Sequence, residues 1–256
     1  MVRLSMLNKI KFAYKKLRKT FNSKKDIEKF NAIPELRNLH KLFSADPESK
    51  WIIGQKEALR IYQLIKDDDP KNIIELGLGI GAGAAIMAMA SSPDARITSL
   101  EQYQKCIDIV ERIFPKELRG KVKFIFSSAC AFQNTKISKY LYFSGYRNLP
   151  LSADIKYDFV VIDGPGAFME GNEFVKLPNG DLINLLPYLK FGCKIFCDGR
   201  KKQVEIYERY LSDYVKVMER EQNYTVFERT EKQLKNMDEF KPVDLELFVR
   251  TKKGYF

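Results

Sequence analysis

A glycine-rich turn between an apolar strand and a helix of small residues is the clearest chemical signal in the sequence. It covers residues 75–83 and reads ELGLGIGAG. Glycines are needed where the backbone must approach a ligand more closely than a Cβ atom permits. The free N–H groups at the start of the following helix then attract a carboxylate or a phosphate. The turn also satisfies a G-x-G-x-x-A pattern, so on its own it fits a dinucleotide as well.

Acidic residues at three strand ends narrow the choice of ligand. Glu75 lies two residues before Gly77, where an acid would repel pyrophosphate but can accept a hydrogen bond from an amino-acid ammonium group. Glu101 ends the next apolar strand, where a carboxylate can accept both hydroxyls of a ribose. Asp163 ends a later strand, and ligands of open α/β sheets bind at that carboxyl edge. These acids therefore favour a nucleoside that carries an amino acid.

The arrangement resembles the class I S-adenosylmethionine-dependent methyltransferases over about residues 50–255. The resemblance implies that the glycine turn holds the methionine end of the donor, that Glu101 holds its ribose, and that the two residues after Glu101 flank its adenine. Ser128 stands where many members have an aspartate on the adenine amino group. The implied donor-binding residues are Glu75, Gly77, Gly79, Gly81, Glu101, Gln102, Tyr103 and Ser128.

Two carboxylates at neighbouring strand ends are the candidates for catalysis. Asp163 begins a D-G-P turn and Asp198 begins the sequence D-G-R, and both are predicted at the edge where the donor binds. The D-G-P turn resembles that of small-molecule and sugar O-methyltransferases, including glucuronoxylan methyltransferases. This resemblance implies that Asp163 is a general base and that Asp198 and Arg200 contact the acceptor. His40, the only histidine, precedes the core and is not favoured as the base.

A divalent metal bound by Asp163 and Asp198 is an alternative use of the same acids. Metal-dependent catechol-type O-methyltransferases also have acids at these strand ends, but they follow the second with Asn, where this chain has Gly199. We therefore do not favour a metal. The four cysteines form no C-x-x-C pair, and we expect them to be reduced and mostly buried, as in a cytoplasmic protein.

Alternating strand and helix patterns must position these residues. We predict a doubly wound, Rossmann-like methyltransferase fold with a mostly parallel seven-stranded sheet, closed by an antiparallel C-terminal hairpin. The predicted strands are 72–76, 96–100, 122–126, 159–162 and 194–197, with 224–229 and 245–251 forming the hairpin. The predicted helices are 51–67, 82–90, 105–114 and 202–218.

Two segments lie outside this alternation. Residues 1–30 contain ten Lys or Arg and two acids, so they hold +8 of the net charge of +11. Their apolar residues fall on one helical face, which is typical of a helix that binds an anionic membrane surface or packs on protein.

The methyltransferase domain then covers 31–256, with an insertion at 131–157 as a candidate substrate lid. Within it, Tyr146 and Arg147 are candidate acceptor-binding residues.

The favoured function is methylation of a hydroxyl on a glycan or another small molecule, in the cytoplasm or at the cytoplasmic face of a membrane. A second hypothesis is RNA methylation, with the basic leader binding phosphates. It is less favoured because the chain has no N/D-P-P-Y/F motif. A third is a non-catalytic scaffold with the methyltransferase fold, against which the intact Glu75, Gly77, Gly79 and Glu101 argue.

Overall fold

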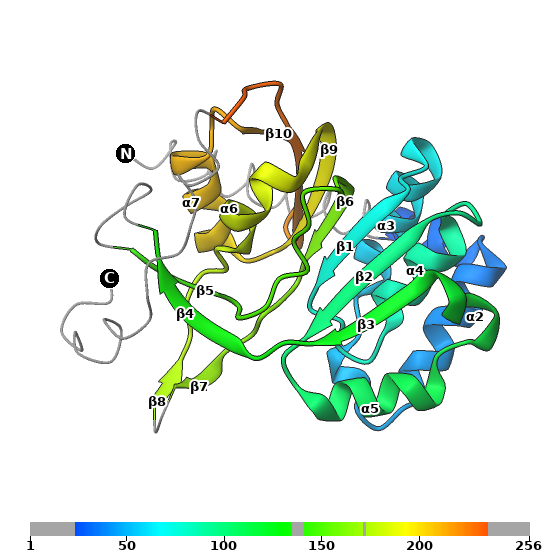
Figure 1. The fold of residues 1–256 in the computed structure, drawn as a ribbon. Coiled ribbons are helices and arrows are strands. Elements are labelled where there is room, and N and C mark those ends of the chain that lie inside the picture. Colours follow the sequence, from blue (N-terminus) through cyan, green and yellow to red (C-terminus); the bar gives the residue numbers. More distant parts are fainter. Residues whose placement is uncertain (1–23, 135–140, 171–172, 235–256) are drawn as a thin grey trace, which may run out of the picture.

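A seven-stranded sheet forms the centre of the protein in the computed structural model, which describes residues 24–134, 141–170 and 173–234 (Figure 1). The strand order is β10-β11-β9-β6-β1-β2-β3. The five strands from β9 to β3 pair in parallel, whereas β11 pairs antiparallel with both β9 and β10. The strands are β1 (Asn72–Leu76), β2 (Arg96–Glu101), β3 (Val122–Phe126), β6 (Tyr157–Ile162), β9 (Leu189–Asp198), β10 (Val215–Arg220) and β11 (Tyr224–Arg229).

Helices cover both faces of this sheet (Figure 1). Side chains alternate between the faces of a strand, so both faces of a central parallel sheet need apolar cover. Ile73 of β1 packs in one core with α2, α3, α4 and α5, and its neighbour Ile74 packs in the opposite core with α6 and α7. The helices are α2 (Pro34–Ser44), α3 (Gln55–Asp68), α4 (Ala82–Ala90), α5 (Gln104–Ile113), α6 (Asp181–Leu185) and α7 (Lys201–Tyr210), and residues 24–31 are also helical.

The predicted doubly wound fold is therefore confirmed, with β1 and β3 at the predicted bounds. The prediction of one long helix over 202–218 is wrong. Helix α7 ends at Tyr210, and Val215–Arg220 is strand β10, which forms the hairpin with β11. The burial of β10 does not alternate, because the strand lies at the edge of the sheet and has a bulge between Val217 and Glu219, so the sequence pattern gives no clear strand signal here. The segment 245–251, our predicted hairpin partner, lies outside the described residues.

Two small antiparallel sheets flank the carboxyl edge of the main sheet. One pairs β4 (Ala129–Gln133), which begins just before the predicted insertion at 131–157, with β5 (Tyr142–Tyr146), which lies inside it. The other pairs β7 (Phe168–Glu170) with β8 (Glu173–Val175), shortly after β6. Phe168 and Val175 pack against Ala131 of β4, so a small apolar core joins the two sheets. Neither sheet is predicted from the sequence.

The N-terminal leader falls largely outside the described part of the chain, which begins at residue 24. Its predicted amphipathic stripe is therefore not described. Phe30, at the end of the leader, is 1% exposed and packs in the core with α2. In the part of the chain that the structure describes, no helix is long and apolar enough to cross a bilayer. All four cysteines are buried and free, as predicted.

Candidate active site

The glycine-rich turn connects β1 to α4 in a left-handed backbone conformation. Gly77, Gly79 and Gly81 have φ values of 105°, 54° and 95°, a region that other residues rarely adopt. The backbone N–H groups of Gly77 and Leu78 both donate to the Leu100 carbonyl oxygen, at 3.1 and 2.9 Å. The turn is thereby fixed to the end of β2, beside Glu101.

Glu101 is held below this turn by three backbone donors. The Gly79 N–H donates to its Oε2 at 2.9 Å, and the N–H groups of Gln102 and Tyr103 donate to its Oε1 at 2.8 and 3.0 Å. Burial of the carboxyl raises its pKa above the ordinary value, while the three donors oppose this change. Each carboxylate oxygen has two lone pairs, so the group keeps acceptor capacity for a ligand.

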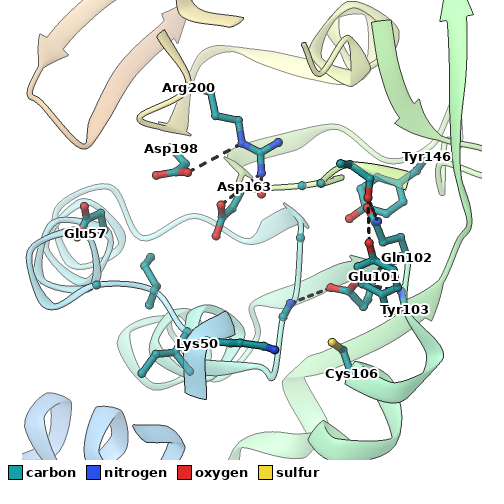
Figure 2. Close-up of a pocket in the computed structure, with 18 of the residues that line it drawn as sticks. Lys50, Glu57, Glu101, Gln102, Tyr103, Cys106, Tyr146, Asp163, Asp198 and Arg200 are labelled. Carbon is teal, nitrogen blue, oxygen red and sulfur yellow. Dashed lines mark hydrogen bonds and ion pairs between the residues drawn. The ribbon is translucent and has the colours of Figure 1, made fainter. Parts of the chain in front are cut away.

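A cleft of about 490 Å³ opens at this edge of the sheet (Figure 2). Its volume is typical of a small-molecule site. The structure brings together nine of the predicted site residues around it, namely Gly77, Gly79, Glu101, Gln102, Tyr103, Tyr146, Asp163, Asp198 and Arg200. The donor turn and the acids predicted for catalysis thus share one cavity.

Glu75 does not line this cleft. The residue is 2% exposed, and its carboxyl accepts a hydrogen bond from the Ser99 hydroxyl and lies against Gly83 in the first turn of α4. Burial raises the pKa of Glu75 to about 8. The structure therefore places Glu75 as a support beneath the glycine turn, which does not favour the direct ammonium contact that we predict from the sequence.

Three further predicted residues also lie away from the cleft. Gly81 faces Val110 of α5, and an added Cβ would collide with that side chain, so the glycine serves helix packing. Ser128 lies between β3 and β4, where its carbonyl oxygen accepts a hydrogen bond from the Arg147 N–H at 2.9 Å. Arg147 is exposed. The sequence gives the position of each residue along the chain but not the direction of its side chain.

Asp163 and Asp198 face each other where β6 and β9 end, with Arg200 beside them (Figure 2). The guanidinium of Arg200 lies 3.7 Å from Asp163 Oδ1 and 3.9 Å from Asp198 Oδ2. It also donates to two carbonyl oxygens of the loop after β6, those of Asp163 and Pro165. Arg200 is therefore fixed between the two strand ends.

Loss of water and neighbouring carboxyl groups raise the pKa of Asp163. Its side chain lies in the cleft with 45% of its surface exposed, and the partial loss of water is the largest cause. The second cause is the neighbouring Asp198 carboxyl, which contacts it and repels its negative charge, while Arg200 opposes the shift. A carboxylate with a raised pKa is suited to accept a proton near neutral pH.

A metal ion does not fit this pair well. The guanidinium of Arg200 occupies the space beside both carboxylates and would repel a cation. Among the described residues, no group of three or more His, Cys, Asp and Glu side chains is arranged to hold a metal ion. We therefore assign no catalytic step to a metal.

Tyr146 and His40 have different surroundings. Tyr146 ends β5, is 4% exposed, and donates from its hydroxyl to the Leu100 carbonyl oxygen at 3.4 Å, so its ring forms a wall of the cleft. His40 lies in α2 with its Nε2 2.9 Å from the Ile53 carbonyl oxygen. Its ring packs edge-on against Phe30 at 5.4 Å between centroids. His40 does not line the cleft.

Several residues of the cleft carry no sequence signal. The segment before α3 contributes Lys50, Ile52, Ile53 and Gly54, and the first turn of α3 contributes Glu57. The loop and hairpin after β6 contribute Gly164, Gly166, Ala167 and Phe174. The Ala167 carbonyl oxygen accepts hydrogen bonds from Gln102 Nε2 at 3.1 Å and from the Tyr103 hydroxyl at 2.9 Å. These contacts join segments that are about sixty residues apart in sequence, which no local motif reveals.

No protein-family model and no curated protein matches the sequence. Solved structures do match the fold. The O-methyltransferase TomG from Streptomyces achromogenes, solved in complex with SAM and involved in tomaymycin synthesis, is 14% identical, with a TM-score of 0.51 over 75% of this chain and 89% of that one. A candidate caffeoyl-CoA O-methyltransferase from Staphylococcus aureus is 16% identical, with a TM-score of 0.52 over 83% and 99%.

A candidate O-methyltransferase from Klebsiella pneumoniae is similar to the same degree. It is 13% identical, and its TM-score is 0.51 over 80% of this chain and 96% of that chain. At these identities the likeness concerns the fold and not the substrate. The mostly parallel seven-stranded sheet, covered by helices on both faces, gives this chain the Rossmann-like methyltransferase fold.

Proposed function

We propose that the protein is an S-adenosylmethionine-dependent methyltransferase that acts on a hydroxyl group of a small molecule. The observation that carries this proposal is the single cleft that contains both the Gly77–Gly79 turn with Glu101 and the pair Asp163 and Asp198. One part fits a nucleoside that carries an amino acid, and the other fits a hydroxyl with a removable proton. The O-methyltransferase fold of the similar structures supports the same reaction.

The donor side of the cleft has the groups that S-adenosylmethionine needs. Glu101 Oε2 accepts one backbone hydrogen bond and retains a lone pair for a ribose hydroxyl, whereas Oε1 already accepts two. Gln102 is 9% exposed, and its Oε1 is buried without a hydrogen-bond partner. A buried polar atom without a partner is costly, so this oxygen is suited to accept a hydrogen bond from a bound ligand. Tyr103, 45% exposed beside it, offers a ring to the adenine.

The acceptor side fits removal of a proton from a hydroxyl. When bound, S-adenosylmethionine supplies the methyl group, so that a C–O bond forms as a C–S bond breaks and the acceptor hydroxyl loses one proton. Asp163 receives this proton in our proposal, and Asp198 and Arg200 orient the acceptor. Alignment of two reactants can contribute about 7–11 kcal/mol toward such a step. A positioned base contributes about 10²–10⁴ in rate.

A sugar hydroxyl is the finer form of the proposal. Phe174 lines the cleft and is 72% exposed, so its ring is available to pack against one face of a sugar. Carboxylates and an arginine, as in Asp163, Asp198 and Arg200, are groups that hydrogen bond to sugar hydroxyls. We further propose that the protein works in the cytoplasm, at the membrane face if the basic leader binds anionic lipid.

Calorimetry with S-adenosylhomocysteine tests the donor site. We expect binding to the unsubstituted protein and at least a tenfold loss of affinity in Glu101→Ala, because the ribose loses its acceptor. Glu111→Ala is the matched control, since Glu111 is a surface residue of α5 that pairs with Arg119 away from the cleft. No binding to the unsubstituted protein at high micromolar ligand would contradict the proposal and favour a non-catalytic scaffold.

A further inference from the structure

A buried polar network lies behind the two carboxylates of the cleft. Its centre is the sequence Asn179-Gly180-Asp181 at the start of α6, and both Asn179 and Asp181 are 0% exposed. Buried polar side chains are costly unless all their hydrogen bonds are made. Neither residue lines the cleft, and neither has a part in the donor or acceptor sites described above.

Asn179 is bonded to the loop that carries Asp163. Its Nδ2 donates to the Gly164 carbonyl oxygen at 2.6 Å, so the bond falls on the residue that follows Asp163. The same loop is held from the other side by β1, because the N–H groups of Asp163 and Gly164 both donate to the Leu76 carbonyl oxygen. The backbone around Asp163 is therefore fixed by β1 and by Asn179.

Asn179 is also bonded toward the strand that carries Asp198. Its backbone N–H donates to Gln203 Oε1 at 3.3 Å, and Gln203 Nε2 in turn donates to Cys197 Sγ at 3.0 Å. Cys197 precedes Asp198 in β9. The backbone N–H of Gln203 further donates to the Arg200 carbonyl oxygen at 2.9 Å. One asparagine thus joins the ends of β6 and β9 through two short routes.

The asparagine itself has little freedom to move. Its Oδ1 accepts a hydrogen bond from the Asp181 N–H at 2.8 Å, and its carbonyl oxygen accepts one from the Tyr207 hydroxyl at 2.8 Å. Its Nδ2 also donates to Asp181 Oδ2 at 3.0 Å. Asp181 accepts two further contacts from the Tyr146 N–H, both at 3.1 Å, which connect the network to the wall of the cleft.

We propose that Asn179 is a positioning residue that sets the separation between the carboxyl groups of Asp163 and Asp198. Strands β6 and β9 are already paired from Phe159 to Ile162, so pairing of the two strands does not depend on the bonds of Asn179 alone. The bonds of Asn179 act beyond the paired residues, where the two acids emerge. Their importance for methyl transfer rests on the proposed function, whereas the separation itself can be measured without it.

Titration of Asp163 reports this separation. The charged groups that face it are Asp198, Arg200 and Glu101, and the buried carboxyl of Glu75 also interacts with it. Of these groups, Asp198 has the largest effect on the pKa of Asp163, and its repulsion weakens as the two carboxyl groups move apart. An opening of the two loops also admits water. Both changes lower the pKa of Asp163 toward its ordinary value.

The experiment follows the ¹³C signal of the Asp163 carboxyl against pH by NMR, with Asp163→Asn used to assign it. We expect the midpoint to fall by about one pH unit in Asn179→Ala and also in Gln203→Ala, which cuts only the route to β9. Asn184→Ala is the matched control, because Asn184 lies on α6 and its amide oxygen has no hydrogen-bond partner. We expect no shift in that variant.

Unfolding curves separate a positioning role from a structural one. A variant that unfolds at a lower temperature but keeps the Asp163 midpoint has lost stability alone. If Asn179→Ala does not fold, Gln203→Ala still gives the result. An unchanged midpoint in the folded variants would overturn the proposal. If the unsubstituted protein does not bind S-adenosylhomocysteine, the proposed function is contradicted instead. The two failures are therefore distinguishable.

Discussion

Gly77 and Gly164 approach so closely that a Cβ atom added to either would lie within 2.7 Å of the backbone of the other. This contact joins the donor turn after β1 to the loop that begins with Asp163. The two halves of the cleft are therefore in direct backbone contact, and neither half can move far without the other. Both positions need glycine because of this close approach.

Substitution of Gly77 tests that contact. We expect Gly77→Ala to lower the unfolding temperature and to abolish binding of S-adenosylhomocysteine, because the new methyl group collides with the backbone of Gly164. Gly192→Ala is the matched control, since Gly192 also has a positive φ, of 78°, but open space around its Cβ position. That variant should lose about 1–3 kcal/mol of unfolding free energy through backbone strain, and it should bind the donor normally. Equal donor affinity in both variants would contradict the account.

Substitution of Asp163 tests the base. We expect Asp163→Asn to reduce methyl transfer at least 10²-fold, because an amide cannot accept the proton, while affinity for S-adenosylhomocysteine stays within a few-fold. The measurement is transfer of label from labelled donor to a small-molecule extract. Asp158→Asn is the control, because Asp158 lies near the start of the same strand, where it contacts Lys190 and Asn72 away from the cleft. Full activity in Asp163→Asn would exclude it as the base.

The rate of methyl transfer should depend on pH through Asp163. Its pKa is raised in the folded protein, so a larger fraction is protonated at neutral pH than for an ordinary aspartate. Only the ionised form can accept a proton, and we therefore expect the rate to rise as the pH increases through the neutral range. A rate that is constant from about pH 5 to 9, with a pH-independent acceptor, would contradict this assignment.

Glu75 should make stability fall as the pH rises. Its pKa is about 8 in the folded protein and about 4.3 in an unfolded chain, so the folded state binds the proton more tightly between these values. The associated stabilisation is complete below the unfolded pKa and is lost as the pH rises through about 8. Urea unfolding should therefore show a smaller pH dependence in Glu75→Gln, and an unchanged dependence in the exposed control Glu111→Gln. If the free energy of unfolding depends equally on pH in both variants, the raised pKa of Glu75 is contradicted.

The leader is expected to bind anionic vesicles. We predict that the full chain sediments with phosphatidylserine vesicles and that a chain lacking residues 1–23 does not, because the deletion removes seven of the ten basic residues of the leader. The deletion keeps Phe30, which packs in the core. Neutral vesicles provide the control. Equal sedimentation of the two chains with anionic vesicles would remove the membrane hypothesis.

The parts of the site that follow strand ends could be predicted from the sequence. Glu101, Asp163 and Asp198 each end an apolar run, and parallel strands bring such ends to one edge. The glycine spacing likewise indicates the positive φ values of the turn. The direction of a side chain could not be predicted. We expected Glu75 to contact the donor, but its side chain lies beneath the turn, where Ser99 and α4 enclose it.

Contacts between residues that are far apart in the chain could not be predicted from the sequence either. The Ala167 carbonyl oxygen is bonded by Gln102 and Tyr103, and Asn179 is bonded to Gly164 and Gln203, without any local spacing that marks these pairs. Strands of only three residues, such as β7 and β8, carry too little periodicity to be recognised.

A crystal structure with S-adenosylhomocysteine would show whether the donor and the proposed base share this cleft. We expect the ribose to bind the Glu101 carboxylate, the amino-acid end to lie along the Gly77–Gly79 turn, and the sulfur to point toward Asp163. A ligand found elsewhere, or NAD bound in this cleft in preference to S-adenosylhomocysteine, would contradict this expectation.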